Sequence, residues 1–215
     1  MLPLGDINPR RTFPWLTYLL ILANFIMFFV EMNADKAFIF NWAFIPERFL
    51  NNPLGETSTL FSSIFMHAGW LHILGNMLYL WIFGDNVEDR LGHFRFLLFY
   101  FICGLAATFA HLVFNIESGI PVLGASGAIA GVLGAYIVMF PRSSVAVLMG
   151  LFIIPLPAIL VIGFWVVIQI FYGVGSIGYA DQVGVAYMAH IGGFVTGLLL
   201  AIIYRIFGRI RTSRR

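Results

Sequence analysis

Residues 124–134 read GASGAIAGVLG and contain a single serine, Ser126, within a run of small residues. A polar turn gives way here to an apolar stretch, so we expect Ser126 at the start of a helix, beside backbone N–H groups that lack partners within that helix. Small residues three or four positions apart also let membrane helices pack closely. From this segment alone, Ser126 is either an incidental member of a packing surface or a reactive hydroxyl.

The composition of the whole chain excludes an ordinary soluble domain. Of its 215 residues, 60% are hydrophobic and 10% are charged, whereas soluble proteins contain about 25% charged residues. Cys103, the only cysteine, lies in an apolar run and cannot form an intrachain disulfide. We therefore expect an all-α, polytopic membrane protein that has no nucleic-acid partner.

The intervals without charged residues predict the membrane spans, because a spanning helix needs about 20 mostly apolar residues. Residues 31–56 mix charged and aromatic side chains, so we expect a loop that lies in the membrane interface. Pro155 and Pro157 are expected to kink the fifth span. The chain is thus predicted to form one domain, residues 1–215, a bundle of six transmembrane helices at roughly 14–31, 65–84, 96–116, 126–141, 147–171 and 186–205.

The basic residues predict how this bundle is oriented. With six spans both termini lie on one side of the membrane, and that side receives all 12 lysines and arginines except Lys36 and Arg48. Cytoplasmic loops carry such an excess of basic residues. We therefore expect an integral protein of a prokaryotic plasma (inner) membrane, with both termini in the cytoplasm.

This topology brings unusual polar residues of three spans to a similar depth. Ser126 begins the fourth span on the outer side, and His190 lies about two turns into the sixth. His72 and Asn76 lie in the outer half of the second span. Because ionisable groups within a membrane are costly, they mark a functional site by default. We therefore expect a site toward the outer side of the membrane.

The predicted helix faces also agree. His190, Gly193 and Gly197 fall on one stripe of the sixth span, and Ser126 and Gly134 fall on one stripe of the fourth. Small residues on both stripes would let the two helices approach until the serine reaches the imidazole. A base within hydrogen-bonding reach makes a serine hydroxyl nucleophilic.

The second span supplies groups of a different kind. His72 and Asn76 are four residues apart and therefore share a helix face. Their N–H donors, with the backbone N–H of Ser126, suit an oxyanion hole, in which negative charge develops on an attacked carbonyl oxygen. No acidic residue lies at this depth, so the sequence predicts a Ser–His dyad without a carboxylate.

Other classes of membrane protein fit less well. A helical zinc protease would carry His-Glu-x-x-His, which the sequence lacks, so we expect neither a metal nor a cofactor. A proton-coupled or cation-coupled transporter would be expected to carry carboxylates within its apolar runs. A small-solute channel or transporter nevertheless stays open as an alternative.

Three motifs together resemble the rhomboid intramembrane serine proteases. The resemblance runs from about residue 65 to residue 197 in the family's order of spans, and it includes residues 88–92 after the second span. The motifs are Gly124-Ala125-Ser126-Gly127, His72 with Asn76, and Ala189-His190 followed by Gly193 and Gly197.

The resemblance implies an enzyme that cleaves a peptide bond in or next to a transmembrane segment of its substrate. Ser126 would be the nucleophile and His190 the general base, while His72, Asn76 and the Ser126 amide would hold the oxyanion. Its partners would be transmembrane protein substrates within the lipid bilayer, whose identity stays open, as does the oligomeric state. A non-catalytic rhomboid-like protein that binds membrane clients is the alternative, although such proteins typically lack the serine or the histidine.

The resemblance also implies supporting roles. Gly124 would keep the approach to the serine open, and Glu88 and Arg90 would brace the inner turn by hydrogen bonding. Residues 172–187 would form a cap. Some relatives carry an aromatic residue one turn after the nucleophile, where this chain has Ala130. We therefore expect Tyr187 or Phe194 to pack against the imidazole instead.

Overall fold

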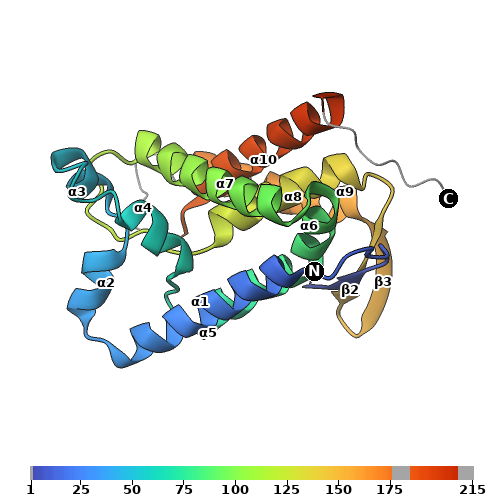
Figure 1. Cartoon of the computed structure of the whole chain (residues 1–215), viewed down its shortest axis with the longest axis horizontal. Coiled ribbons are helices and arrows are strands. Elements are labelled where there is room, and N and C mark those ends of the chain that lie inside the picture. The colour runs from blue at the N-terminus through green and yellow to red at the C-terminus, as the bar shows by residue number, and fades with distance from the viewer. Residues whose placement is uncertain (1, 176–184, 208–215) are drawn as a thin grey trace.

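The computed structural model describes residues 2–175 and 185–207 and shows a mostly helical polytopic membrane protein (Figure 1). Four helices are long and apolar enough to cross a membrane, and a fifth apolar helix, α8 (Ser126–Met139), is shorter. The four are α1 (Trp15–Asn33), α7 (His93–Phe114), α9 (Ala158–Gly175) and α10 (Tyr187–Phe207).

The predicted second span, residues 65–84, is helical only from Trp70. Helix α5 (Trp70–Tyr79) runs into a π-helical turn, η2 (Leu80–Gly84), and the chain continues beyond the predicted span as α6 (Asp85–Leu91). Gly92, with a φ of +80°, separates α6 from α7; a left-handed conformation of this kind favours glycine. The first loop holds four short elements: α2 (Lys36–Trp42), α3 (Pro46–Asn51), α4 (Thr59–Ser62) and the 3₁₀ turn η1 (Ser63–Phe65).

The prediction of an all-α chain was wrong, because the N-terminal segment forms a small sheet with two later strands. Three antiparallel strands form a sheet in the order β1-β2-β3, and Val147 of β2 pairs with Pro3 of β1 and with Ile154 of β3. The strands are β1 (Leu2–Asp6), β2 (Ser144–Met149) and β3 (Phe152–Pro157). The helix predicted from residue 147 therefore begins only at Ala158.

The two prolines account for this difference. Proline removes a backbone donor and clashes with the preceding turn inside a helix, but it is tolerated on an edge strand. Pro155 and Pro157 both lie on β3, an edge of the sheet, and so are part of a strand rather than a kink in a helix. Gly150, with a φ of +61°, lies in the turn between β2 and β3. Val145 and Val147 of β2 are fully buried in the core.

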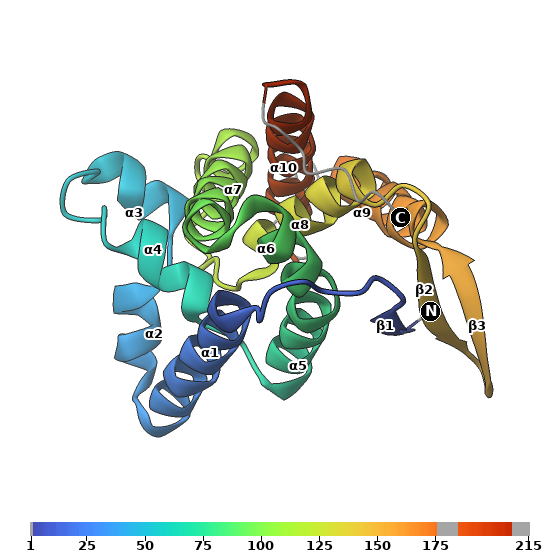
Figure 2. The ribbon, with the colours of Figure 1, turned by 45° about the vertical axis from the view of Figure 1, so that its right-hand side comes forward.

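Contacts among helix ends define the two ends of the bundle. The Tyr204 hydroxyl of α10 donates to the carbonyl oxygen of Arg90 at 3.3 Å, and Arg205 donates to the carbonyl oxygen of Val138 at 3.4 Å. The ends of α6, α8 and α10 therefore lie together, beside the start of α1 and the sheet, as Figures 1 and 2 show. Ser126 and His190, near the starts of α8 and α10, lie toward the opposite end. Most of the predicted cap, residues 176–184, and the last four arginines lie outside the described residues.

Candidate active site

Ser126 and His190 come together where α8 and α10 run side by side. Ser126 is the first residue of α8, and His190 lies in the first turn of α10, nearer the start of the helix than the two turns expected from the sequence. The Oγ atom of Ser126 lies 2.7 Å from Nε2 of His190, a hydrogen-bonding distance. Because Ser126 begins its helix, its backbone N–H lacks an acceptor within α8. One hydroxyl, one imidazole and at least one backbone donor therefore meet at this point.

Glycines set the distance between the two helices. A Cβ atom at Gly193 would overlap the carbonyl oxygen of Gly127, and one at Gly197 would overlap that of Gly131. A Cβ atom at Gly134 would overlap the carbonyl oxygen of Phe194. The backbones of α8 and α10 are thus in direct contact through Gly127 and Gly131, which neighbour the stripe expected from the sequence. This close approach lets the short serine side chain reach the histidine.

His72 lies beside the turn that leads into α8. A Cβ atom at Gly124 would lie 2.8 Å from both Nε2 and Cε1 of His72, and Gly124 has a φ of +130°, so no other residue fits there without strain. The backbone N–H of Ala68 donates to Nδ1 of His72 at 3.3 Å. A neutral imidazole that accepts at Nδ1 carries its proton on Nε2. The structure therefore directs an N–H donor of His72 toward the segment that contains Ser126.

Asn76 lies one helical turn beyond His72 on α5. Its side chain is buried, with 8% of its surface exposed, and its amide nitrogen Nδ2 has no hydrogen-bond partner among the described residues. An unpaired buried donor costs about 1–3 kcal/mol, so it needs an explanation. One explanation is that this donor is kept for an acceptor that arrives with a ligand.

Glu88 and Arg90 lie at the opposite end of the bundle from Ser126. The fully buried Glu88 carboxylate accepts hydrogen bonds from the backbone N–H groups of Leu16 and Thr17, at 3.1 and 2.7 Å, and from Nδ1 of His93 at 2.6 Å. It thereby caps the start of α1, where a helix favours negative charge. The Arg90 guanidinium lies over the ring of Phe140, 4.9 Å from its centroid. Both residues join helices at this end of the bundle.

Comparison with known proteins places the chain in a family. The family model described as "Rhomboid domain" matches residues 54–207, which is more than half of the chain. The chain belongs to the rhomboid family. In this rhomboid, the match includes the helices that carry Ser126, His190, His72 and Asn76.

Curated relatives come from plants, bacteria, fungi and animals. "RHOMBOID-like protein 1" of Arabidopsis thaliana is 30% identical over 90% of this chain and 54% of its own length. "Rhomboid protease GluP" of Bacillus subtilis is 34% identical over 87% of this chain and 34% of its own length. "Rhomboid protein 1, mitochondrial" of Saccharomyces cerevisiae is 32% identical over 74% and 45%. The chain thus spans from about a third to about half of the length of these relatives.

Two residues of α9 hold His190 in this rhomboid, and the sequence did not single them out. The Oε1 atom of Gln169, which is buried, lies 2.7 Å from Nδ1 of His190. The Trp165 ring lies against the imidazole with centroids 5.7 Å apart, and Tyr187, one of the two residues expected there, lies edge-on at 6.5 Å. A lone glutamine in an apolar span was the available signal, since polar side chains in membranes seek partners on other helices.

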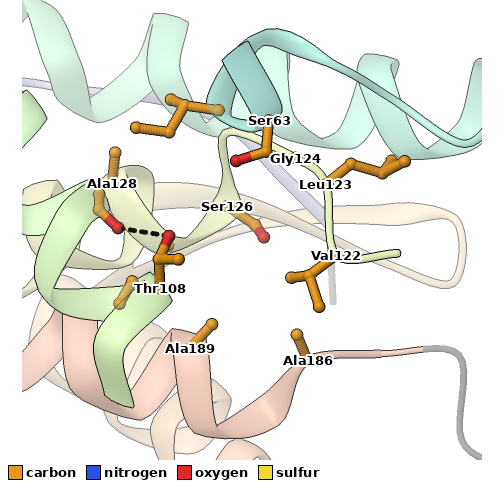
Figure 3. A pocket seen from close by; sticks show the side chains of 13 residues that line it. Ser63, Thr108, Val122, Leu123, Gly124, Ser126, Ala128, Ala186 and Ala189 are labelled. Carbon is orange, nitrogen blue, oxygen red and sulfur yellow. Dashed lines mark hydrogen bonds between the residues drawn. The ribbon is translucent and has the colours of Figure 1, made fainter. Parts of the chain in front are cut away.

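A pocket opens beside the serine and is lined mostly by small or apolar side chains. Figure 3 shows the Ser126 hydroxyl pointing toward the space between Val122 and Ala189, with Thr108 on the neighbouring α7. Within residues 2–175 and 185–207, no three histidine, cysteine, aspartate or glutamate side chains gather closely enough to share a metal ion.

Proposed function

We propose that this protein is an intramembrane serine endopeptidase that cleaves membrane-protein substrates within or next to their transmembrane segments. The observation that carries the proposal is the 2.7 Å contact between Ser126 Oγ and His190 Nε2. A serine that only packs needs no imidazole, whereas a nucleophilic serine needs a base within this distance. Membership of the rhomboid family, in which one relative is named a protease, supports the same conclusion.

The first half of the reaction forms an acyl-enzyme. Ser126 Oγ attacks the scissile carbonyl carbon while its proton passes to Nε2 of His190, and the carbonyl oxygen becomes an oxyanion. When the tetrahedral intermediate collapses, His190 gives that proton to the departing amine nitrogen and the C–N bond breaks. The substrate's carbonyl carbon is then held as an ester of Ser126.

Three donors serve the oxyanion in this proposal. They are Nε2–H of His72, Nδ2 of Asn76 and the backbone N–H of Ser126. The tautomer of His72 is fixed by the Ala68 amide, and the Asn76 amide nitrogen has no partner among the described residues. Donors that are already in place stabilise a developing charge without reorganisation, and each is worth about 10²–10³ in rate.

Water completes the cycle. A water molecule gives a proton to His190 and attacks the ester carbon, and His190 then returns that proton to Ser126 Oγ as the new carboxylic acid departs. No cofactor or metal is needed for either half. Because small residues line the pocket beside Ser126, we propose that a small side chain of the substrate is bound there.

The proposal includes an orientation in the membrane. Arg10 lies 3.5 Å from Asp85, and Arg95 lies over the Tyr204 ring, so these basic residues cluster at the end of the bundle away from Ser126. Basic residues favour the cytoplasmic side. We therefore propose that this end faces the cytoplasm and that the site lies toward the outer side. The membrane in this proposal is a prokaryotic plasma membrane.

Cleavage in proteoliposomes tests the function. The purified protein is reconstituted with a panel of single-span substrates, and the products are mapped by mass spectrometry. We expect cleavage near one membrane boundary by the wild type and none by Ser126→Ala or His190→Ala, with all three proteins equally folded. If Ser126→Ala cleaves at the wild-type rate, the proposal is wrong, and a folded wild type that binds substrates without cleaving them identifies a client-binding protein.

A further inference from the structure

Helix α9 meets the rest of the bundle along one stripe. Its buried residues lie on one face of the helix, with the half-buried Trp165 between them, while the opposite face exposes large apolar side chains such as Phe164 and Val167. The buried residues are Ala158, Val161, Ile162, Gln169 and Gly173. Gln169 lies on the buried stripe and is the only residue of this apolar helix with an amide side chain. It lies about 17 Å along the helix axis from Ala158, and its 2.7 Å contact with Nδ1 of His190 places it at the depth of the imidazole.

The contact between Gln169 and His190 determines where the imidazole proton lies. Oε1 of the glutamine is an acceptor only, so Nδ1 of His190 must donate to it. In the neutral ring Nε2 is then unprotonated, and it faces Ser126 Oγ at 2.7 Å. This is the tautomer that can accept the serine proton; the other one presents an N–H group to the hydroxyl and cannot act as a base.

The α9 contacts also fix the plane of the ring. Trp165 precedes Gln169 by four residues, so both side chains leave the same face of α9. Trp165 packs beside the imidazole while Gln169 bonds to its far nitrogen. Ala130 of α8 has too small a side chain to pack against the ring in this way. The side chains that orient the base therefore come from α9, together with Tyr187 of α10, and not from the helix of the nucleophile.

We propose that Gln169 is a positioning residue that holds His190 in the Nδ1-protonated tautomer, in the role that a carboxylate plays in a Ser-His-Asp triad. The proposal rests on the proposed function. A neutral amide can fix the tautomer without adding charge to the membrane interior, where a carboxylate would be costly. It cannot stabilise the imidazolium as strongly as a carboxylate does, which distinguishes glutamine from glutamate at this position.

Substitutions of Gln169 test the proposal through kcat, KM and the pH dependence of cleavage in proteoliposomes. In Gln169→Leu we expect kcat to fall about 10- to 100-fold, while KM and thermal stability change little. This loss is smaller than the ~10⁴-fold loss of kcat that follows when a triad histidine is held in the wrong tautomer. In Gln169→Glu we expect most of the activity to return. The acid limb of the pH–rate profile of Gln169→Glu should move to higher pH, because a carboxylate beside His190 favours the charged imidazolium.

A matched control separates positioning from packing. Asn24 of α1 is a fully buried amide that donates to the Leu20 carbonyl oxygen of its own helix at 2.7 Å, so Asn24→Leu should keep wild-type kcat and pH dependence. Gln169→Met, which is closer in shape, replaces Gln169→Leu if the latter does not fold. A wild-type kcat in Gln169→Leu or Gln169→Met overturns the proposal. It is also overturned if Gln169→Glu loses as much kcat as Gln169→Leu and the acid limb of its pH–rate profile does not shift. If Ser126→Ala also cleaves, it is the proposed function that fails.

Discussion

The carbonyl oxygen of Gly127 on α8 occupies the position that a side chain at Gly193 on α10 would need. The two backbones are in contact at this point, one residue after Ser126 and three residues after His190. Helix packing and chemistry therefore depend on the same glycines, because the separation of the backbones sets the 2.7 Å distance from serine to imidazole.

Gly193→Ala tests this dependence. The added methyl group must push α10 away from α8, so we expect cleavage to fall at least about tenfold, with a loss of about 1–3 kcal/mol in unfolding free energy, as overpacked cores show. Gly163→Ala on α9 is the control, because its Cβ atom would meet nothing within 4 Å. Cleavage rates in proteoliposomes and thermal unfolding in detergent measure the two effects. Wild-type cleavage by Gly193→Ala would refute the link.

Replacement of the buried Glu88 carboxylate should lower stability and leave the chemistry intact. Glu88→Gln removes the charge that caps α1 through Leu16 and Thr17, and hydrogen bonds to charged groups contribute about 1.5–3 kcal/mol. Asp89→Asn is the matched control. The half-buried Asp89 carboxylate accepts through Oδ1 from the backbone N–H groups of Arg11 and Thr12 and from the Thr12 hydroxyl, and an asparagine Oδ1 can still accept these bonds, so this variant should lose less stability than Glu88→Gln. Thermal unfolding in detergent compares the variants, and equal losses would contradict a specific cap by Glu88.

Asn76→Leu should separate activity from stability. Removal of a proposed oxyanion donor is expected to lower kcat about 10²–10³-fold. Because the amide nitrogen of Asn76 has no partner among the described residues, its loss should leave the unfolding free energy unchanged or raise it. Cleavage assays and thermal unfolding on the same preparation measure both. A variant that is both fully active and less stable would show that Asn76 is structural.

A pH effect on stability is expected where the sheet meets α6. Burial first, and then the charge of Asp6, raises the pKa of Asp85 from its ordinary value of 3.8 to about 6, although Arg10 lies 3.5 Å away. The folded protein then holds this proton more tightly than the unfolded chain does. The stabilisation is therefore present below about pH 4 and is lost as the pH rises through about 6.

Asp85→Asn isolates this contribution. Between about pH 4 and pH 7 the unfolding free energy of the wild type should fall by at most about 3 kcal/mol on account of Asp85, and the asparagine variant should lack that part of the fall. Melting temperatures in detergent across this range provide the measurement. Parallel curves for the two proteins would show that Asp85 does not titrate as expected.

The sequence could pair the serine with its candidate partners because their signals are periodic. His190, Gly193 and Gly197 mark one helix face by spacing alone, and Ser126 marks the start of another helix. His72 and Asn76 share a face for the same reason. Helical periodicity needs no knowledge of long-range packing, so these residues could be paired before their distances were known.

The remaining features depend on tertiary contacts. Gln169 is a single polar residue with no periodic partner, and only the packing of α9 brings it to His190. The sheet needs β1 to pair with a strand more than 130 residues later in the chain, which no local pattern reveals. Pro155 and Pro157 indicated an irregularity in the fifth span. Proline is compatible both with a kinked helix and with an edge strand, so the sequence could not distinguish the two.

A fluorophosphonate probe tests the central claim most directly, because it forms a covalent bond only with an activated serine and needs no knowledge of the substrate. The protein is labelled in liposomes, digested and analysed by mass spectrometry. We predict one adduct, on Ser126, which is absent from Ser126→Ala and strongly reduced in His190→Ala. Undiminished labelling of Ser126→Ala, or no labelling of the folded wild type, would contradict the assignment of Ser126 as the nucleophile.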